Sequence, residues 1–113
     1  MPNFPLSPIR QIGDLYFISG QIGQQDGKLV AENITEQTTQ AIANIAAILK
    51  QNGLEIKDVI DVTAFLTDQS DYDEFNEAYR QGFQEPYPTR TTVTVKSLPL
   101  GARVELKAIA SKV

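Results

Sequence analysis

The segment that most constrains the fold is residues 86–110, near the end of the 113-residue chain. Its Thr, Val, Leu and Ile side chains alternate with polar ones on either side of a Pro/Gly turn, which predicts two β-strands. Two prolines lead into the first strand and bring Arg90 to its start. A sheet would hold the backbone of Arg90 and leave its guanidinium free to bind a carboxylate. The alternative is a solvated or salt-bridged arginine, as most charged side chains are exposed.

The composition excludes several kinds of catalytic site. The sequence contains no cysteine and no histidine, which excludes a disulfide, a thiolate nucleophile, a Ser-His-Asp triad and imidazole or sulfur ligands for a metal. It has no glycine-rich phosphate loop and no internal repeat. We therefore expect no metal and no other cofactor, and any chemistry must use Arg, Lys, Asp, Glu, Tyr, Ser, Thr, backbone amides and water.

Length, charge and hydropathy limit the architecture and the partners. With 42% hydrophobic residues, residues 1–113 are expected to form a single domain with a modest core. The net charge of −4 argues against nucleic acid and against an anionic membrane as partners, because these are bound by clustered Lys and Arg. No segment approaches the ~20 apolar residues of a membrane span, and no signal peptide is recognisable. We expect a soluble, cytoplasmic protein.

The N-terminal quarter predicts an irregular arm followed by a hairpin. Three prolines within residues 1–8 favour an extended arm that cannot pair fully in a sheet. Residues 9–12 and 15–20 flank a Gly-Asp turn and are expected to pair, with the second strand apolar on both faces. Ser19-Gly20 allows the backbone to approach a ligand closely, and a strand end followed by a turn explains the pair equally well.

Residues 34–52 have the apolar period of an amphipathic helix. Asn33 and Glu36 predict a capping box at its start, and Gly53 is typical of a helix stop. Residues 57–67 then carry apolar or β-branched side chains on both faces of a strand. With only two helices available, the second face needs another cover, for which we expect a second subunit; the alternative cover is the N-terminal arm.

A second helix is expected to begin between residues 68 and 71, with Ser70 or Asp71 as its N-cap, and to end by residue 85, before a proline. Aromatic residues recur in it at helical spacing, a stripe that more often packs on a sheet than binds a ligand. They are Tyr72, Phe75, Tyr79 and Phe83. Asn76 is the side chain of this helix for which we expect a polar, ligand-binding role.

The predicted order of elements is strand, strand, helix, strand, helix, strand, strand. The closing stretch contains the motifs Pro88-Thr89-Arg90, Leu98-Pro99, Val104-Glu105-Leu106 and Ala108-Ile109-Ala110. With these motifs, the chain resembles the Rid family (reactive intermediate deaminases), also called the YjgF family. Further similarity lies in Ile18-Ser19-Gly20-Gln21-Ile22, in the helix containing Asn44, and in Val62-Thr63-Ala64-Phe65-Leu66. The resemblance extends from about residue 8 to residue 110.

Resemblance to this family implies an α+β fold like that of the chorismate mutase of bacilli, with a mixed β-sheet and two helices on one face. It also implies a homotrimer whose sheets meet as a central barrel, with three clefts between neighbouring subunits. The implied activity is that of a 2-aminoacrylate-type deaminase, which hydrolyses small 2-imino or 2-enamino acids to 2-keto acids and ammonia. No metal is needed for it.

The resemblance further implies which residues form the site. The arginine corresponding to Arg90 binds the substrate carboxylate, and the glutamate corresponding to Glu105 lies near a catalytic water. Ser19 and Gly20 line the same cleft. Without the resemblance, the favoured interpretation of Glu105 is a strand residue that pairs with Arg103, Lys107 or a neighbouring lysine.

Two positions depart from the family pattern. Many active members have Gly-Pro-Tyr-Ser where this chain has Ser7-Pro8-Ile9-Arg10, so we expect Ile9 in place of the cleft tyrosine. Thr92 stands where many members have a cysteine, and it keeps a hydroxyl group for substrate binding. We add Thr92 and Asn76 to the predicted binding residues.

Two other functions compete with the deaminase. A non-catalytic module would use the same cleft to sense or sequester a small carboxylate. The ribonuclease activity attributed to some family members is disfavoured by the negative net charge and by the lack of histidine for acid–base cleavage.

Overall fold

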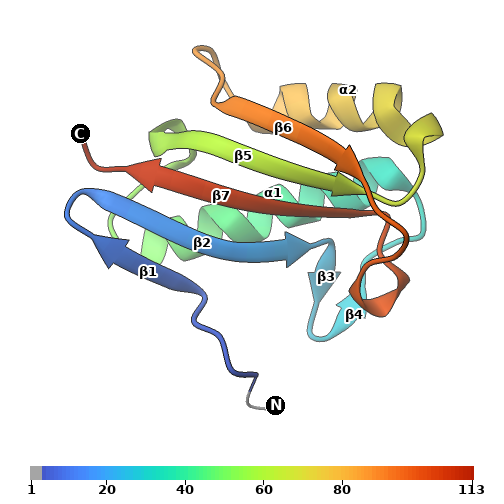
Figure 1. Cartoon of the computed structure of the whole chain (residues 1–113), viewed down its shortest axis with the longest axis horizontal. Helices are drawn as coiled ribbons and strands as arrows, with labels where there is room; N and C mark the ends of the chain where they lie inside the picture. Colours follow the sequence, from blue (N-terminus) through green and yellow to red (C-terminus); the bar gives the residue numbers. More distant parts are fainter. Residues whose placement is uncertain (1–3) are drawn as a thin grey trace.

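A five-stranded mixed sheet forms the centre of the computed structural model, which describes residues 4–113 (Figure 1). Its strand order is β1-β2-β7-β5-β6. Strands β5 and β6 are parallel, and all other neighbours are antiparallel. The strands are β1 (Ile9–Ile12), β2 (Leu15–Ile22), β5 (Val59–Leu66), β6 (Thr89–Thr94) and β7 (Val104–Ser111). The predicted α+β fold with a mixed sheet is confirmed.

A small second sheet follows β2 and was not predicted from the sequence. It consists of β3 (Gln24–Gln25) and β4 (Lys28–Leu29). Asn44, on the helix that follows, donates hydrogen bonds to the carbonyls of Ile22 (3.1 Å) and Gln24 (3.0 Å). Asn44 therefore holds the corner between the two sheets, a structural role for a residue that carried part of the family resemblance.

Two helices, α1 (Ile34–Gln51) and α2 (Tyr72–Gly82), cover one face of the main sheet (Figure 1). Asn33 caps α1 by accepting a hydrogen bond from the Glu36 amide at 2.8 Å, and its side-chain amide donates to the Glu36 carboxylate. Gly53 has a φ of 77°, the left-handed conformation that commonly ends a helix. The predicted limits of this helix are confirmed to within one residue. Within residues 4–113, neither helix is both long and apolar enough to cross a membrane.

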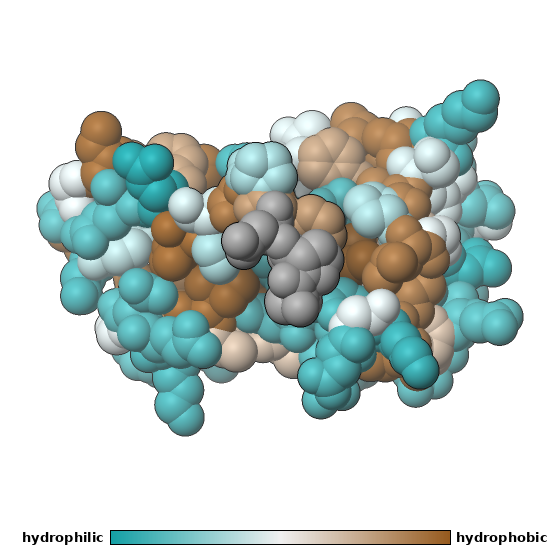
Figure 2. Space-filling view, turned by 90° about the horizontal axis from the view of Figure 1, so that it is seen from below, coloured by the Kyte–Doolittle hydropathy of each residue, from teal (hydrophilic) through white to brown (hydrophobic). Residues whose placement is uncertain are grey.

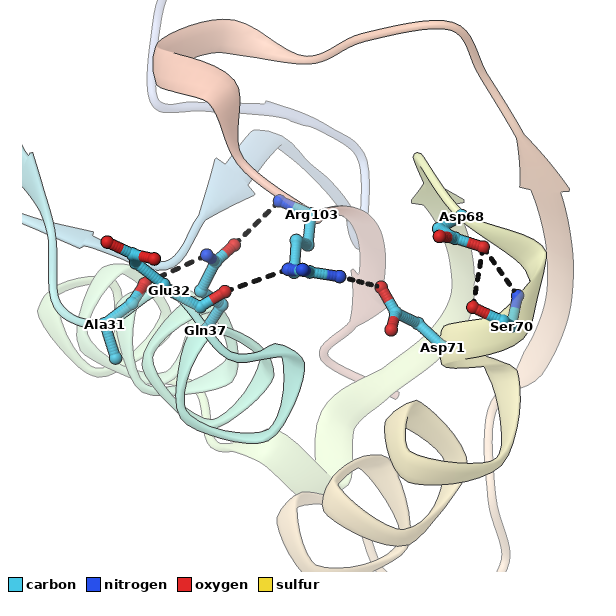
Figure 3. Close-up of polar contacts among 7 residues, drawn as sticks. All are labelled: Ala31, Glu32, Gln37, Asp68, Ser70, Asp71 and Arg103. Atoms are coloured by element: carbon cyan, nitrogen blue, oxygen red, sulfur yellow. Dashed lines mark hydrogen bonds and ion pairs between the residues drawn. The ribbon is translucent and has the colours of Figure 1, made fainter.

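The start of α2 lies where the sequence predicts it, with Asp71 at the N-cap position, but its capping contacts differ from the prediction. A 3-10 turn (Gln69–Asp71) precedes the helix, and its capping side chain is Asp68, which accepts from the Ser70 amide at 2.9 Å. Asp71 occupies the N-cap position of α2 but makes no capping hydrogen bond. Its carboxylate lies 2.9 Å from Arg103 Nη1 instead (Figure 3). The prediction of Asp71 as N-cap is therefore confirmed in position. Its side chain does not cap the helix, because a charged guanidinium is a stronger partner than a backbone amide.

Arg103 links the start of β7 to both helices (Figure 3). Its amide donates to Gln37 Oε1 at 2.8 Å, and its Nε donates to the Glu32 carbonyl at 2.9 Å. Gln37, which is buried, donates in turn to the Ala31 carbonyl. Together with the ion pair to Asp71, these contacts fix the backbone two residues before Glu105 and the beginning of α2.

The buried core lies between the helices and the sheet. Alternate residues of the two central strands point toward the helices and are buried: Val62, Ala64 and Leu66 in β5, and Val104, Leu106, Ala108 and Ala110 in β7. The residues between them point to the opposite side, because side chains alternate along a strand. We call this side the open face, since no helix covers it.

The open face carries large apolar side chains. They include Ile12, Leu15, Phe17, Phe65, Val93 and Ile109, of which Ile12 is 69% exposed, Leu15 and Phe17 37% and Val93 40%. Figure 2 looks at the molecule from the β1 side and shows apolar groups interleaved with polar ones. The strands thus have the second apolar face expected from the sequence, and within residues 4–113 it is only partly covered.

Strands β6 and β7 are separated in the sheet although one turn joins them in the chain. β5 lies between them and pairs with both. The turn at Pro99–Gly101 therefore does not close a hairpin; Leu100 and Gly101 adopt φ values of 59° and 70° there. This crossing decides on which faces the two predicted catalytic residues lie.

Candidate functional site

Arg90 lies on β6, at the edge of the sheet, and its side chain points toward α2. Its guanidinium carbon is 4.7 Å from the ring centroid of Tyr79, 5.1 Å from that of Phe75 and 5.9 Å from that of Tyr72. Its Nη2 also donates to the Tyr72 hydroxyl at 3.3 Å. Aromatic faces attract a cation without neutralising it. In the described part of the chain, no carboxylate lies within 4.0 Å of this guanidinium, so it is free to bind an anion.

A cavity of about 320 Å³ adjoins the guanidinium. It is lined by Asn76, Tyr79, Arg80, Tyr87, Pro88 and Arg90. The structure therefore places Asn76 and Arg90 around one cavity. Tyr87 and Arg80 were not predicted from the sequence as cavity residues, and Tyr79 was assigned to the core alone. The available signal for a polar site was Arg80, which directly follows Tyr79 in the aromatic stripe.

The Tyr79 hydroxyl is a potential hydrogen-bond donor at this cavity. It is buried and has no hydrogen-bond partner among residues 4–113. Burial raises the pKa of Tyr79 to about 12, although the Arg90 charge acts in the opposite direction. The hydroxyl is therefore protonated at neutral pH, and a buried donor without a partner costs free energy that a ligand atom could recover.

Glu105 lies on β7 and faces the open side of the sheet, directly over Gly20. A Cβ atom added to Gly20 would overlap Glu105 Oε2 and lie 2.8 Å from its Cδ. Burial raises the pKa of Glu105 above its usual value of 4.5. The carboxyl forms no ion pair within residues 4–113, and Arg103 pairs with Asp71 instead. The structure therefore does not support the alternative in which Glu105 pairs with a neighbouring Arg or Lys.

A β-bulge brings Ser19 and Gly20 to this place. β2 pairs with β7 as far as Ile18 and pairs again from Gln21, one residue out of step. Ser19 and Gly20 consequently lie together opposite Lys107. A bulge of this kind leaves an extra residue unpaired and redirects its side chain, which is why the period-two pattern of the sequence did not reveal this arrangement.

A second cavity, of about 380 Å³, lies between the N-terminal arm and the open face. It is lined by Pro5, Leu6, Ser7, Arg10, Phe17, Ile18, Ser19 and Lys107. The Ser19 hydroxyl donates to the Ser7 carbonyl at 2.6 Å and so ties the arm to β2. We call this space the arm cavity.

Ile9 does not line the arm cavity. It pairs with Ile18 and packs against the core, because β1 begins at Ile9 and turns its first side chain toward the helices. The prediction that Ile9 takes the place of the cleft tyrosine is therefore wrong. The residue beside Ser19 is Leu6, and Pro5-Leu6-Ser7 fits the family's Pro-Tyr-Ser pattern better than the later proline does.

Thr92 lies two residues after Arg90 on β6 and also faces the helices. It lines a third cavity of about 450 Å³, together with Tyr72 and Asp73 from the start of α2. Tyr72 borders both this cavity and the Arg90 guanidinium. Thr92 thus shares a face of the sheet with Arg90 but lines a different cavity from Arg90 and Asn76, whereas Ser19 and Gly20 lie with Glu105.

Arg90 and Glu105 do not meet within one chain. Arg90 is in register with Val62, which is buried beneath the helices, whereas Glu105 is in register with Phe65 on the open face. Residues in register on neighbouring strands share a face of the sheet. One chain therefore presents the anion-binding group on one face and the carboxyl group on the other.

Comparison with known proteins agrees with this fold. The family model described as endoribonuclease L-PSP matches residues 2–112. A RutC family protein of Pyrococcus abyssi is 39% identical over 113 residues, which cover 98% of this chain and 89% of that protein. A 2-iminobutanoate/2-iminopropanoate deaminase of Capra hircus is 38% identical over 108 residues, which cover 94% of this chain and 79% of that protein.

Solved structures have the same architecture. The crystal structure of RidA from the Antarctic bacterium Psychrobacter sp. PAMC 21119 has a TM-score of 0.92 at 34% identity, and the match covers 98% of this chain and 91% of that one. Sequence and structure thus match over nearly the whole length. The chain belongs to the endoribonuclease L-PSP family, which is also known as the YjgF or Rid family.

Proposed function

We propose that this protein is a metal-independent deaminase that hydrolyses reactive 2-imino and 2-enamino acids to 2-keto acids and ammonia. The observation that carries the proposal is a pair of groups that have no oppositely charged partner among residues 4–113, the Arg90 guanidinium and the Glu105 carboxyl. Their chemistry matches an anionic substrate attacked by water. Relatives named as imine deaminases at 38% identity support the same reaction.

Two subunits are needed to complete the proposed site. Since Arg90 and Glu105 lie on opposite faces of one sheet, Arg90 of one subunit must approach Glu105 of the next. Such a head-to-tail contact uses two different surfaces, and it closes into a ring when the rotation permits. We propose the homotrimer that family membership implies. The apolar side chains of the open face would supply its buried contacts, and three clefts would result.

In the proposed mechanism, Arg90 holds the substrate carboxylate in a bidentate pair and so orients the C=N carbon. Glu105, whose raised pKa favours proton transfer near neutral pH, accepts a proton from the attacking water. A C–O bond forms, the nitrogen takes up protons, and the C–N bond then breaks to release ammonia and the 2-keto acid. An enamine first takes a proton on carbon to become the imine. The hydroxyls of Ser19 and Thr92 and the Asn76 amide position the substrate.

The rate enhancement required is modest, because imines already hydrolyse in water. Positioned acid–base groups typically contribute about 10²–10⁴-fold.

One observation favours a second candidate, a module that binds small carboxylates without turning them over: Leu6 lies beside Ser19 where many family members place a tyrosine hydroxyl. The two candidates share the ligand and differ in turnover.

The test is to generate 2-iminobutanoate with a threonine dehydratase and to follow release of 2-oxobutanoate with and without the protein. We expect wild-type protein to accelerate the release of 2-oxobutanoate and Arg90→Ala to give no acceleration. The control variant Lys50→Ala, which removes a cation from α1, should accelerate release as much as wild-type protein. Equal rates with and without protein would reject the deaminase. If 2-oxobutanoate then still binds in calorimetry and Arg90→Ala abolishes the binding, the binding module is the better description.

A further inference from the structure

The arm cavity contains two cations that the proposed reaction does not use. Arg10 reaches it from β1 and Lys107 from β7, and both side chains are exposed. Neither lies within 4.0 Å of a carboxylate in the described residues. Lys107 Nζ is 5.7 Å from the ring centroid of Phe17, which forms a wall of the cavity. A chain of net charge −4 thus gathers two unneutralised cations in one space.

This cationic space is adjacent to the Glu105 carboxyl. Lys107 follows Glu105 by two residues on β7, so both side chains face the open side, about 7 Å apart along the strand. The bulge connects the two groups: Ser19 lines the arm cavity, and its neighbour Gly20 contacts Glu105. A substrate with its reacting carbon at Glu105 would therefore extend its side chain toward Arg10 and Lys107.

We propose that the arm cavity binds a second carboxylate of the substrate, so that the preferred substrates are 2-imino dicarboxylic acids, the imines of acidic amino acids. The inference rests on the proposed function, because it assumes that the reacting carbon lies beside Glu105. Arg10 offers a planar, bidentate donor and Lys107 a point charge, and both are suited to a carboxylate. A five-carbon diacid carries its second carboxylate three carbons beyond the reacting carbon, on the side chain that would extend toward these cations.

Binding tests the second site independently of turnover. Calorimetry would compare 2-oxoglutarate with 2-oxopentanoate, which has the same carbon chain and lacks the second carboxylate. We expect wild-type protein to bind 2-oxoglutarate about tenfold more tightly, the gain that two partly exposed ion pairs supply. Arg10→Gln/Lys107→Gln should abolish this preference and leave 2-oxopentanoate binding unchanged. Lys28→Gln/Lys50→Gln, which removes the same charge from β4 and α1, should keep the preference.

Kinetics separate the failure of this inference from that of the proposed function. A flavin L-amino-acid oxidase would supply the imines of glutamate and of norvaline. If both are hydrolysed equally well and the double variant changes neither rate, the second site is rejected while the deaminase stands. If neither is hydrolysed but the preference for 2-oxoglutarate depends on the two cations, the deaminase fails and the second site is supported. The double variant could instead lose binding of 2-oxoglutarate and 2-oxopentanoate equally and dissociate into monomers in size-exclusion chromatography. This result would show that the two cations join subunits, and it would overturn the inference.

Discussion

The Glu105 carboxyl occupies the space that a Cβ atom on Gly20 would fill. Gly20 is not among the glycines with positive φ, so its backbone conformation does not require glycine. The requirement comes from the close approach of the carboxyl to the bulge in β2. A side chain at this position would change where the proposed general base lies.

Gly20→Ala should therefore impair catalysis more than stability. The first atoms that the new methyl group meets are at the flexible end of a side chain, which can move aside, so the free energy of unfolding should change by less than about 1 kcal/mol. Displacement of Glu105 should lower kcat at least about tenfold. Steady-state kinetics and urea denaturation check the two effects. In a Glu105→Ala background the same substitution should cost nothing more, and an additive loss would contradict this explanation.

The raised pKa of Glu105 predicts a pH dependence of stability. Because burial raises the pKa above 4.5, protonation favours the folded state. This stabilisation is complete below 4.5 and is lost as the pH rises through the raised value. Glu105→Gln cannot titrate, so its stability should match that of wild-type protein in acid and exceed it at neutral pH. Denaturant titrations of both proteins from acid to neutral pH would measure the difference in the free energy of unfolding. A difference that stays constant with pH would contradict the prediction.

The same shift predicts the acid limb of activity. A general base must be deprotonated, so kcat/KM should fall as the pH drops through a pKa above 4.5. The limb should be absent from the residual activity of Glu105→Gln. A limb that persists in this variant would assign the titration to another group.

The local elements could be predicted from the sequence because their signals are local. Asn33 and Glu36 begin α1 through contacts three residues apart, and Gly53 ends it through its own backbone conformation. Likewise, the β-branched and apolar run of β5 and the alternation of residues in β7 predict strands without reference to neighbours. Arg90 could be placed at the start of β6 for the same reason, since two prolines precede it closely.

The assembly of the site could not be predicted, because it depends on which strands become neighbours. The insertion of β5 between β6 and β7 puts Arg90 and Glu105 on opposite faces. The register shift at Ser19 is a pairing property, invisible to a period-two pattern. Pro5-Leu6 and Pro8-Ile9 both place an apolar residue directly after a proline, and the packing of β1 shows which of the two lies at the arm cavity.

Arg103 should contribute to stability more than an ordinary surface cation. Its partner Asp71 is 7% exposed, and removal of the guanidinium leaves a buried carboxylate without its partner. Arg103→Gln should lower the free energy of unfolding by about 1–3 kcal/mol. Lys57→Gln is the matched control, since Lys57 and Glu55 are both exposed and 3.8 Å apart; about 0–1 kcal/mol is expected there. Equal effects in urea denaturation would contradict the proposed difference.

Arg90→Lys should separate charge from geometry. Lysine keeps the positive charge but loses the planar fork that binds both carboxylate oxygens. We expect KM for 2-iminobutanoate to rise about 10–100-fold, the range of a charge-assisted hydrogen bond, with a smaller change in kcat. Initial-rate kinetics measure both constants. An unchanged KM would show that Arg90 does not bind the substrate carboxylate.

Mixing two strongly impaired variants tests whether neighbouring subunits share the site. Arg90→Ala retains Glu105, and Glu105→Gln retains Arg90, so a mixed trimer contains clefts in which both groups are intact. If equal amounts are unfolded and refolded together, random closed rings should have both groups in about a quarter of their clefts. Activity should return to about that fraction of the wild-type value, whereas each variant refolded alone keeps at most a low residual activity. No recovery, with trimers present in size-exclusion chromatography coupled to light scattering, would mean that Arg90 and Glu105 do not act across a subunit boundary.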